Sequence, residues 1–318
     1  MIKAQQISYK HKEFHILNDV NVSLGFGEFL AIVGPNGAGK SSLLSVLANE
    51  VKTNHQILFK DKNIRDWKVA ELSKHKAKFS QHNSNDIPLE VKDVVMMGRY
   101  PYFDAQPKKE DHEAMNKMMY ETDVYHLKDR EYNTLSGGEK QRVHLSRVMA
   151  QLQNDITHKL VFLDEPLNNL DIKHQYKALE IIKNFTNKAN SAIVVLHDLN
   201  LAAQFADKIL LMKSGKVSAF GTPQEVFTAE NISQAYQFVE TENAQIGFVA
   251  MSQVFSEGKL LKGSAWIVPS QLYSPIQQDA ILLLAGQKNS AAIALMRYLK
   301  TDKAKSVMRA YGYSHPTQ

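Results

Sequence analysis

Cysteine is absent from this 318-residue chain, and its absence excludes several classes of protein at once. Without thiols there can be no disulfide framework, no thiolate-ligated metal and no cysteine nucleophile. An excess of one charge is also lacking, since 38 lysines and arginines against 33 acidic residues leave a net charge of only +5. So small an excess is not the basic footprint of a nucleic-acid-binding protein, and we expect no nucleic-acid partner.

Long apolar segments are missing as well. The longest runs, near Ile193–Leu196 and Ile281–Ala285, are far shorter than the roughly 20 residues with which a helix crosses a bilayer. The N-terminal stretch MIKAQQISYKHKEF has no apolar core of the kind found in signal peptides. We therefore expect the chain to stay in the cytosol and to associate with a membrane only through a partner.

The apolar runs that are present predict an α/β fold. FLAIV (Phe29–Val33), LVFLDEP (Leu160–Pro166) and SAIVVLHD (Ser191–Asp198) each contain a compact run typical of a buried parallel strand. Helical patterns separate these runs, and strands that alternate with helices indicate a parallel sheet. Short alternating stretches in residues 1–33 predict further strands, which belong to an antiparallel β subdomain.

The middle of the chain is expected to be mainly helical. Residues 66–79 are rich in lysine and predict a solvated helix, and Leu89–Gln151 continues with a helical pattern. We therefore predict a helical subdomain at about residues 81–151. After the third strand, ILLMKSGKVSAFGTP (Ile209–Pro223) predicts a hairpin that turns at Ser214–Gly215.

The segment GPNGAGKSS has the spacing of a phosphate-binding loop and lies between a predicted strand and a predicted helix. Its glycines let backbone N–H groups approach phosphate oxygens, and the start of the next helix favours negative charge. Lys40 is expected to reach the β- and γ-phosphates of ATP, and the Ser41 hydroxyl to bind Mg²⁺. A glycine-rich turn without a ligand is the alternative. The predicted nucleotide-binding residues here are Gly34, Pro35, Asn36, Gly37, Ala38, Gly39, Lys40, Ser41 and Ser42.

The strand LVFLDEP ends in two acidic residues. Asp164 is expected to hold Mg²⁺, directly or through water, and Glu165 to orient and deprotonate the water that attacks the γ-phosphate. By itself the motif is weak, because many strands end in acids. Its place downstream of the phosphate-binding loop makes a nucleotide hydrolase the favoured interpretation.

LSGGEKQR (Leu135–Arg142) places Ser136, Gly137 and Gly138 before a helical run, which predicts a second anion-binding helix start. Ser136 followed by Glu139 is equally an ordinary capping box, and both interpretations can hold together. With this segment the chain resembles the ATP-binding-cassette family, whose signature motif it matches. The resemblance implies an ATPase that forms a homodimer, in which the signature of one subunit closes over the γ-phosphate bound to the other.

The resemblance extends to further positions. Gln81 matches a glutamine that touches Mg²⁺ and the transmembrane partner, His197 a histidine that contacts the γ-phosphate, and Tyr9 an aromatic residue that stacks on adenine. For each there is a plainer alternative: an exposed loop residue, a structural histidine at a strand end, and a packing tyrosine in a strand. Asp171 matches a dimer contact, whereas Leu167 departs from the threonine or serine that is usual at its position.

The stretches VVMMGRYPYFDAQPKKEDHEAM, LSGGEKQRVHLSRVMAQL and VVLHDLNLAAQFADKILLMKSGKVSAFGTPQEVFTAENI are most similar to ATPases of haem, siderophore and vitamin B12 importers. The resemblance covers roughly residues 1–230 and is closest to the haemin-import branch. It implies ATP-driven transport through two transmembrane permease subunits at the cytoplasmic face of the inner membrane. A periplasmic haemin-binding protein is then an indirect partner.

Other cargoes and other classes stay open. A siderophore, vitamin B12 or molybdate importer is the alternative within the family. The rival from another class is a soluble cassette ATPase that acts on ribosomes or DNA. Such proteins usually carry paired cassettes or long coiled-coil insertions, and this sequence shows neither a second phosphate-binding loop nor sustained heptads.

The tail differs from the rest of the chain. Residues 229–318 resemble the C-terminal part of periplasmic molybdate-binding proteins, which implies a partial α/β periplasmic-binding-protein-like module. Only about the last third of such a protein is present, so its oxyanion cleft would lack half of its residues. We predict domains at 1–228 and 229–318. The tail is interpreted as a packed accessory domain, a vestigial fusion, an assembly artefact or an oxyanion sensor.

Overall fold

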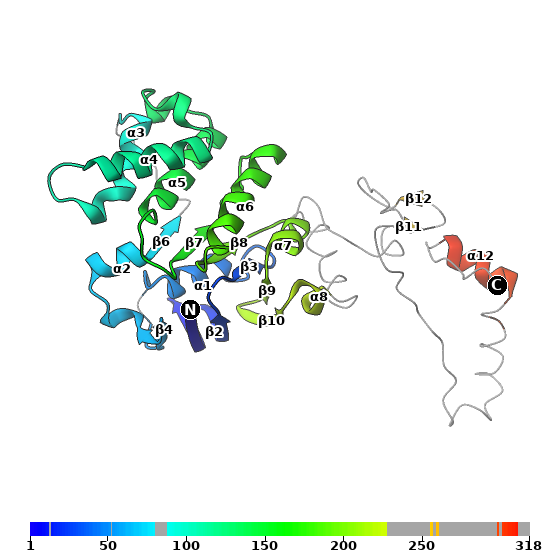
Figure 1. Ribbon diagram of the computed structural model, residues 1–318. Coiled ribbons are helices and arrows are strands. Elements are labelled where there is room, and N and C mark those ends of the chain that lie inside the picture. Colours follow the sequence, from blue (N-terminus) through cyan, green and yellow to red (C-terminus); the bar gives the residue numbers. More distant parts are fainter. Residues whose placement is uncertain are drawn as a thin grey trace. The chain divides into compact units, whose positions relative to one another are not determined.

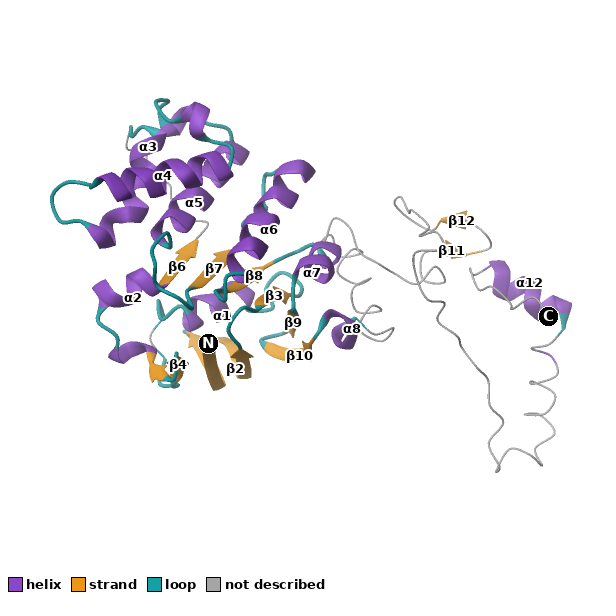
Figure 2. Cartoon of the chain, in the orientation of Figure 1, coloured by secondary structure: helices purple, strands orange, loops and turns teal. Residues whose placement is uncertain are grey.

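The computed structural model describes residues 1–12, 14–51, 53–79, 88–227, 255–256, 259–260, 298 and 301–310 (Figure 1). The chain divides into two compact units, Met1–Thr228 with Phe238–Gly247, and Ala229–Gln237 with Phe248–Gln318. The first unit contains an antiparallel sheet, a larger mixed sheet and a group of helices above them; Figure 2 colours the strands orange and the helices purple. None of the helices in the described part of the chain combines the length and apolar character that a bilayer crossing requires.

The smaller sheet is antiparallel and has the strand order β2-β1-β4-β5. Val20, Val22 and Leu24 alternate with exposed residues along β2, so one face of the sheet is buried and the other is solvated. This confirms the strands expected in the first 33 residues. The strands are β1 (Ile2–His11), β2 (Phe14–Leu24), β4 (Ile57–Phe59) and β5 (Lys62–Asn63).

The larger sheet has the order β10-β9-β3-β8-β7-β6, with parallel pairs throughout except at the β9–β10 hairpin. Every residue of β3 and β8 is buried, which explains their unbroken apolar sequences. The predicted α/β core is therefore confirmed. Its strands are β3 (Phe29–Val33), β6 (Lys76–Phe79), β7 (Leu160–Asp164), β8 (Ser191–Val195), β9 (Lys208–Lys213) and β10 (Lys216–Gly221).

One sequence-based expectation was wrong. The helix predicted over residues 66–79 is only α2 (Val69–His75), and Lys76–Phe79 forms strand β6 at the edge of the core sheet. Ala77 and Phe79 point into the core while Lys76 and Lys78 are half-buried, so the segment has the two-residue period of a strand. Pairing with β7 overrides the lysine-rich local composition, which by itself gave no strand signal.

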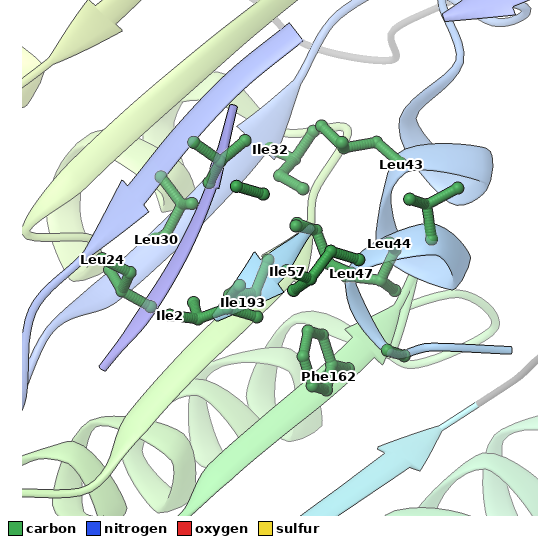
Figure 3. Close-up of a cluster of buried hydrophobic side chains, with 14 of the residues drawn as sticks. Ile2, Leu24, Leu30, Ile32, Leu43, Leu44, Leu47, Ile57, Phe162 and Ile193 are labelled. Carbon is green, nitrogen blue, oxygen red and sulfur yellow. The ribbon is translucent and has the colours of Figure 1, made fainter. Parts of the chain in front are cut away.

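A shared hydrophobic core joins the two sheets around helix α1 (Lys40–Leu47). Figure 3 shows Leu43, Leu44 and Leu47 of this helix facing side chains of both sheets, among them Ile2 and Phe162. Each large apolar side chain buried in this way contributes roughly 1.5–3 kcal/mol to folding. The helix that begins at the phosphate-binding loop is thereby held rigidly against the sheets.

The helical subdomain lies apart from the sheets in Figure 1. Its central helix, α5, packs against α3, α4 and the 3₁₀ helix η2. The mainly helical character expected between residues 89 and 151 is confirmed. The elements are α3 (Val91–Met96), η2 (Met97–Tyr102), α4 (Lys109–Glu121), η3 (Tyr125–Leu127), η4 (Tyr132–Thr134) and α5 (Gly137–Gln151).

The remaining helices of the first unit are η1 (Ile64–Asp66), α6 (Ile172–Thr186), α7 (Leu199–Phe205) and α8 (Pro223–Val226). In the second unit, β11 (Phe255–Ser256) pairs with β12 (Lys259–Leu260), and α12 (Asp302–Ala310) follows. The last helix was expected at Asp302–Tyr311. The other helices and strands expected in the tail lie outside the described residues.

Candidate active site

Three neighbouring strands of the core sheet end at one edge and carry the predicted site. β3, β8 and β7 lie side by side, and their carboxyl ends are level, because Ile32 pairs with Val195 and Val195 with Asp164. The loops that follow these strands contain Gly34, Glu165 and His197. Ligands of open α/β sheets bind at this edge. The fold therefore gathers motifs that are more than a hundred residues apart in the sequence.

The phosphate-binding loop turns sharply between β3 and α1. Gly37 and Gly39 have φ angles of 77° and 95°, in the left-handed region that side chains other than glycine rarely adopt. Asn36, Gly37 and Ser41 are exposed, whereas Ala38 is buried. The loop thus presents backbone and the start of α1 to solvent, as a phosphate cradle requires.

Lys40 is the first residue of α1 and is only 5% exposed. Its Nζ donates hydrogen bonds of 2.9 Å to the carbonyl oxygens of Gly34 and Pro35. Burial lowers the pKa of Lys40, while the nearby carboxylates of Glu165 and Asp164 raise it. Two of the three ammonium donors thus bond to the loop itself, and the third remains for an anion above it.

Ser41 and Asp164 form a pair of oxygen ligands. The Ser41 hydroxyl donates a hydrogen bond of 2.9 Å to Oδ1 of Asp164. Burial raises the pKa of Asp164, and the hydrogen bond from Ser41 lowers it. Within the described residues, no group of three or more histidine, cysteine or acidic side chains could hold a metal alone. This donor set fits Mg²⁺, which typically takes one or two protein oxygens and completes its shell with phosphate and water.

Both carboxylate oxygens of Glu165 are hydrogen-bonded. Nε2 of His197 lies 2.8 Å from Oε1, and Nδ2 of Asn168 donates a 2.7 Å bond to Oε2. The hydrogen bond from His197 is the largest cause that lowers the pKa of Glu165 to about 2, against an opposing effect of burial. The φ angle of Glu165 is 51°, and its carbonyl accepts a 3.0 Å bond from Nε2 of Gln141 on α5. A strained backbone held by a second element is typical of a functional turn.

The turn after β8 sets the position of His197. Asp198 caps α7, since its Oδ1 accepts bonds from the backbone N–H groups of Asn200 at 2.7 Å and Leu201 at 3.2 Å. His197 is thus held between a buried strand and a capped helix. The imidazole ring of His197 therefore lies at the end of the sheet, beside the Glu165 carboxylate.

The segment LSGGEKQR forms the start of α5 in the predicted way. Ser136 is the N-cap, and a capping box with Glu139 is present in both directions. Ser136 and Gly137 are exposed, so this helix start faces solvent on its own subunit. Gly138 lies so close to the chain that a Cβ atom would come within 2.7 Å of the carbonyl oxygen of Asn169.

Comparison with known proteins decides the family. The family model "ABC transporter" matches residues 17–168. The hemin import ATP-binding protein HmuV of Vibrio parahaemolyticus is 39% identical over 239 residues, which are 75% of this chain and 91% of the relative. The chain belongs to the ABC transporter family. It is the ATP-hydrolysing subunit of an ABC importer and binds ATP.

Further similar proteins support the assignment of this ABC ATPase to the family. HmuV of Aliivibrio fischeri is 39% identical over 235 residues, which are 74% of this chain and 90% of the relative. Among solved structures, the dimeric structure of a bacterial ABC transporter cassette has 27% identity and a TM-score of 0.60, covering 70% of this chain and 99% of that one. The resemblance to ATP-binding cassettes noted from the motifs is confirmed.

The tail of the ABC ATPase matches a different family. The model "Bacterial extracellular solute-binding protein" matches residues 183–314, beginning within α6 of the cassette. The resemblance of the tail to a solute-binding protein is therefore confirmed, whereas molybdate as its ligand stays a prediction.

Not every predicted site residue of this ABC ATPase lies at the sheet edge. Tyr9 is half-buried and packs against the hydrophobic core, so its role at adenine stays a prediction. Asp171 is exposed and caps α6, accepting a 2.9 Å bond from the backbone N–H of His174. Leu167, the residue that departs from the family pattern, is 8% exposed and belongs to the core. Gln81 lies outside the described residues.

Two residues that contact Glu165 were not identified from the sequence. Asn168 lies three residues after Glu165, and Gln141 belongs to the signature segment, but no spacing rule pointed to either. Amide side chains that bond to one carboxylate and to one backbone carbonyl leave no periodic signal. The Gln141 contact appears only where α5 meets the loop after β7, and the Asn168 contact only when that loop has formed its turn.

Proposed function

We propose that the residues at the ends of β3, β7 and β8 form one MgATP-hydrolysing site, which drives transport by closing a dimer. The observation that supports this most is the convergence of Lys40, Asp164, Glu165 and His197 at the level carboxyl ends of adjacent strands. The residues Gly34–Ser42 bind the phosphates, and Lys40 supplies positive charge to them.

Ser41 and Asp164 are the residues that would hold Mg²⁺, with Gln81 as the third member of the set. When bound, the metal neutralises phosphate charge during transfer. The chain's own contribution is to keep two hard oxygen donors 2.9 Å apart at the edge of the site. Lys40 adds a buried positive charge near the same phosphates.

Glu165 acts as the general base. Its carboxylate stays ionised at neutral pH because the hydrogen bond from His197 holds its pKa at about 2. Each of its oxygens accepts one of these hydrogen bonds, and opening one of them would make the carboxylate a stronger base towards water. We assign the opening to the bond with His197, whose imidazole then donates to the γ-phosphate.

The exposed start of α5 completes the site of a neighbouring subunit. Ser136 and Gly137 are exposed, and a helix N-terminus favours phosphate. The dimeric cassette among the similar solved structures supports a two-fold arrangement. We propose that two MgATP molecules lie between the loop of one subunit and the signature of the other, with Asp171 at the same interface.

Mixing two inactive variants tests this arrangement. Lys40→Met disables the loop and keeps an apolar stem of similar length. Gly137→Asp puts a negative charge at the signature, where a Cβ atom would meet only the Asn169 side chain at 3.5 Å. Aspartate in the first turn of a helix is favourable, so this variant should fold. Gly138 is unsuitable, because any side chain there would collide with the backbone.

Each variant alone should hydrolyse almost no ATP. A mixture of the two should regain about one quarter of the original activity, because half of the dimers are mixed and each has one intact composite site. If both halves of the site came from one subunit, mixing would restore nothing. That result, with both variants folded by circular dichroism, would refute the dimer proposal.

We propose haemin as the cargo, because the similar curated proteins are hemin import ATP-binding proteins. The chain then works at the cytoplasmic face of the inner membrane with two permease subunits and, indirectly, a periplasmic haemin-binding protein. Uptake by cells that lack this gene tests the cargo. Loss of growth on haemin, with growth on inorganic iron intact, would support haemin as the cargo. Loss of siderophore, vitamin B12 or molybdate uptake instead would identify that compound as the cargo.

We further propose that residues 1–228 are the complete catalytic cassette and that residues 229–318 form a separate partial module. All residues of the site that the structure describes lie before residue 228. The solute-binding family model covers the tail, which supports its separate origin.

A further inference from the structure

Side chains from other parts of the chain hold the C-terminal end of helix α5 through several hydrogen bonds. Helix ends leave their last carbonyl groups without partners inside the helix. Here five consecutive carbonyl oxygens, two in the last turn of α5 and three in the residues that follow it, each accept a hydrogen bond from one of three side chains outside the helix. The acceptors are Ala150, Gln151, Leu152, Gln153 and Asn154, and the donors are Arg99, Tyr102 and Lys159.

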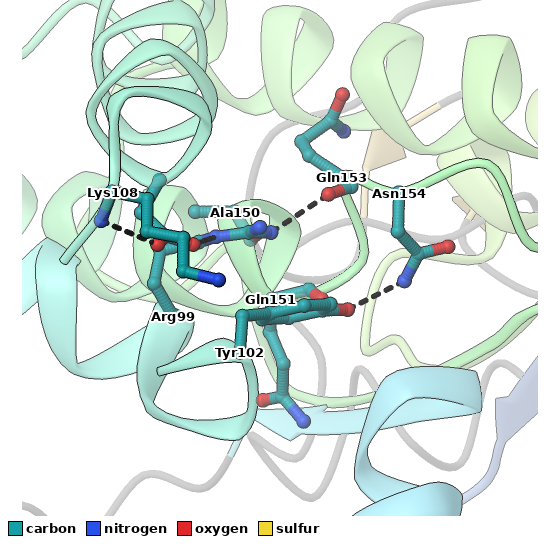
Figure 4. Close-up of polar contacts among 8 residues, drawn as sticks. Arg99, Tyr102, Lys108, Ala150, Gln151, Gln153 and Asn154 are labelled. Carbon is teal, nitrogen blue, oxygen red and sulfur yellow. Dashed lines mark hydrogen bonds and ion pairs between the residues drawn. The ribbon is translucent and has the colours of Figure 1, made fainter. Parts of the chain in front are cut away.

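Arg99 makes the central contacts, which Figure 4 shows. Its Nη1 donates bonds of 2.8 Å to the carbonyl of Ala150 and 2.7 Å to that of Gln153. Its Nε donates a 3.0 Å bond to Oδ1 of Asp111 on α4. Arg99 is 4% exposed, and its guanidinium lies 3.8 Å from the ring centre of Tyr102. A buried guanidinium that makes three hydrogen bonds has little freedom of orientation.

Asp111 and Lys159 fix the anchor to two further elements. Oδ2 of Asp111 accepts a 2.9 Å bond from the backbone N–H of Lys108, so both carboxylate oxygens are bonded. Lys159, the residue before β7, donates bonds of 2.7 and 2.8 Å to the carbonyls of Leu152 and Asn154. β7 ends in Asp164. The anchor therefore ties the signature helix both to α4 and to the strand that carries the acidic residues.

The segment that carries Arg99 is pressed against α5. A Cβ atom at Gly98 would lie 2.2 Å from the carbonyl oxygen of Arg147, in the C-terminal half of α5. Only glycine permits so close an approach. The segment that carries Arg99 is thus packed directly against the backbone of α5 at Gly98.

We propose that Arg99 is a positioning residue for ATP hydrolysis, because it fixes, together with the Gln141–Glu165 bond near the other end of the helix, the angle at which α5 presents Ser136 to the nucleotide. The anchor and Ser136 lie at opposite ends of a 15-residue helix, about 22 Å apart at 1.5 Å per residue. A tilt of only about 3° at the anchor moves the far end by roughly 1 Å over that length. A displacement of about 1 Å at a catalytic group can lower a rate by around a hundredfold. The catalytic consequence rests on the proposed function, whereas the fixed angle does not.

Distances within one subunit test the fixed angle directly. Because the chain contains no cysteine, two introduced cysteines are its only labelling sites. We choose Lys140→Cys, near the start of α5, and Lys188→Cys, at an exposed turn after α6. Spin labels at these positions should give a narrow distance distribution by pulsed electron resonance, because α5 holds one angle relative to the core.

Two variants should broaden or shift that distribution. Arg99→Lys keeps the charge, but one ammonium lacks the guanidinium fork that serves Asp111 and the helix end together. The double variant Arg99→Met with Asp111→Leu removes both buried charges, which proteins often tolerate, and so guards against misfolding of a single variant. Arg65→Lys, at an exposed position outside the subdomain, is the matched control and should leave the distribution unchanged.

The second measurement is the steady-state kinetics of ATP hydrolysis by the unlabelled full chain. Both Arg99 variants should lose roughly tenfold to a hundredfold in kcat, with KM for ATP within about twofold, because the loop that binds ATP is untouched. An unchanged distance distribution would overturn the inference, as would full kcat despite an altered distribution. If the unsubstituted chain did not hydrolyse ATP, the proposed function would fall, while the distance measurement would still decide whether Arg99 sets the helix angle.

Discussion

Nε2 of His197 lies 2.8 Å from Oε1 of Glu165, across the ends of two adjacent parallel strands. The hydrogen bond is the main reason that the pKa of Glu165 is about 2. The carboxylate is thus kept ionised by a hydrogen bond from the residue that is expected to sense the γ-phosphate. Under the proposed function, this bond opens when His197 turns to the γ-phosphate.

Replacing Glu165 by glutamine should separate binding from hydrolysis. The amide keeps the shape of the side chain but cannot accept a proton, and general-base catalysis typically contributes about 10²–10⁴-fold. We expect kcat to fall by that factor, while ATP affinity stays within about threefold and the ATP-bound dimer becomes long-lived. Phosphate release, fluorescent-nucleotide titration and size-exclusion chromatography measure these effects. Glu180→Gln, exposed on α6, is the control, and near-normal turnover in Glu165→Gln would remove Glu165 as the base.

Acid should weaken the fold partly through Glu165. Its folded-state pKa of about 2 is below its ordinary value of 4.5, so the folded chain binds fewer protons than the unfolded chain between these values. This contribution to stability is complete above pH 4.5 and is lost as pH falls towards 2. His197→Ala removes the largest cause of the shift and should raise the pKa of Glu165 towards 4.5. Carbon NMR of the Glu165 carboxylate against pH checks this, and a titration unchanged by the substitution would contradict it.

Asp164→Asn should change the dependence on Mg²⁺. The amide oxygen can still accept the hydrogen bond from Ser41, so the loop should keep its shape. Loss of the negative ligand should raise the Mg²⁺ concentration for half-maximal hydrolysis by roughly tenfold to a hundredfold. Titration of activity with Mg²⁺ at saturating ATP measures this, with exposed Asp104→Asn as the control. ATP binding without Mg²⁺ should be the same in both, and an unaltered Mg²⁺ requirement would exclude Asp164 as a ligand.

Removal of residues 229–318 should leave ATP hydrolysis within about twofold of the full chain, because every described residue of the candidate site lies before residue 228 and separate domains can usually fold alone. The same assay with molybdate distinguishes the interpretations of the tail. Hydrolysis that responds to molybdate only in the full chain would favour an oxyanion sensor over a vestigial module, and collapse of activity in the shortened chain would show an accessory role.

The sequence predicted the local structure of two motifs, because each forms through contacts between neighbouring residues. GPNGAGKSS forms its turn through its own glycines, and Ser136 caps α5 through a contact with Glu139 only three residues away. The unbroken apolar runs of β3 and β8 predict buried parallel strands, even when the neighbouring strands are unknown. Residue type and spacing alone determine such features.

Tertiary structure decided the rest, since the causes lie far apart in the chain. Lys76–Phe79 became a strand because β7 offers a free edge, 84 residues later at Leu160. Arg99 meets the end of α5 some 50 residues away, and Gln141 reaches Glu165 across 24 residues. Side-chain bonds between distant segments carry no period and no fixed spacing. The motifs could therefore be identified from the sequence, whereas the long-range contacts that orient them form only when the chain has folded.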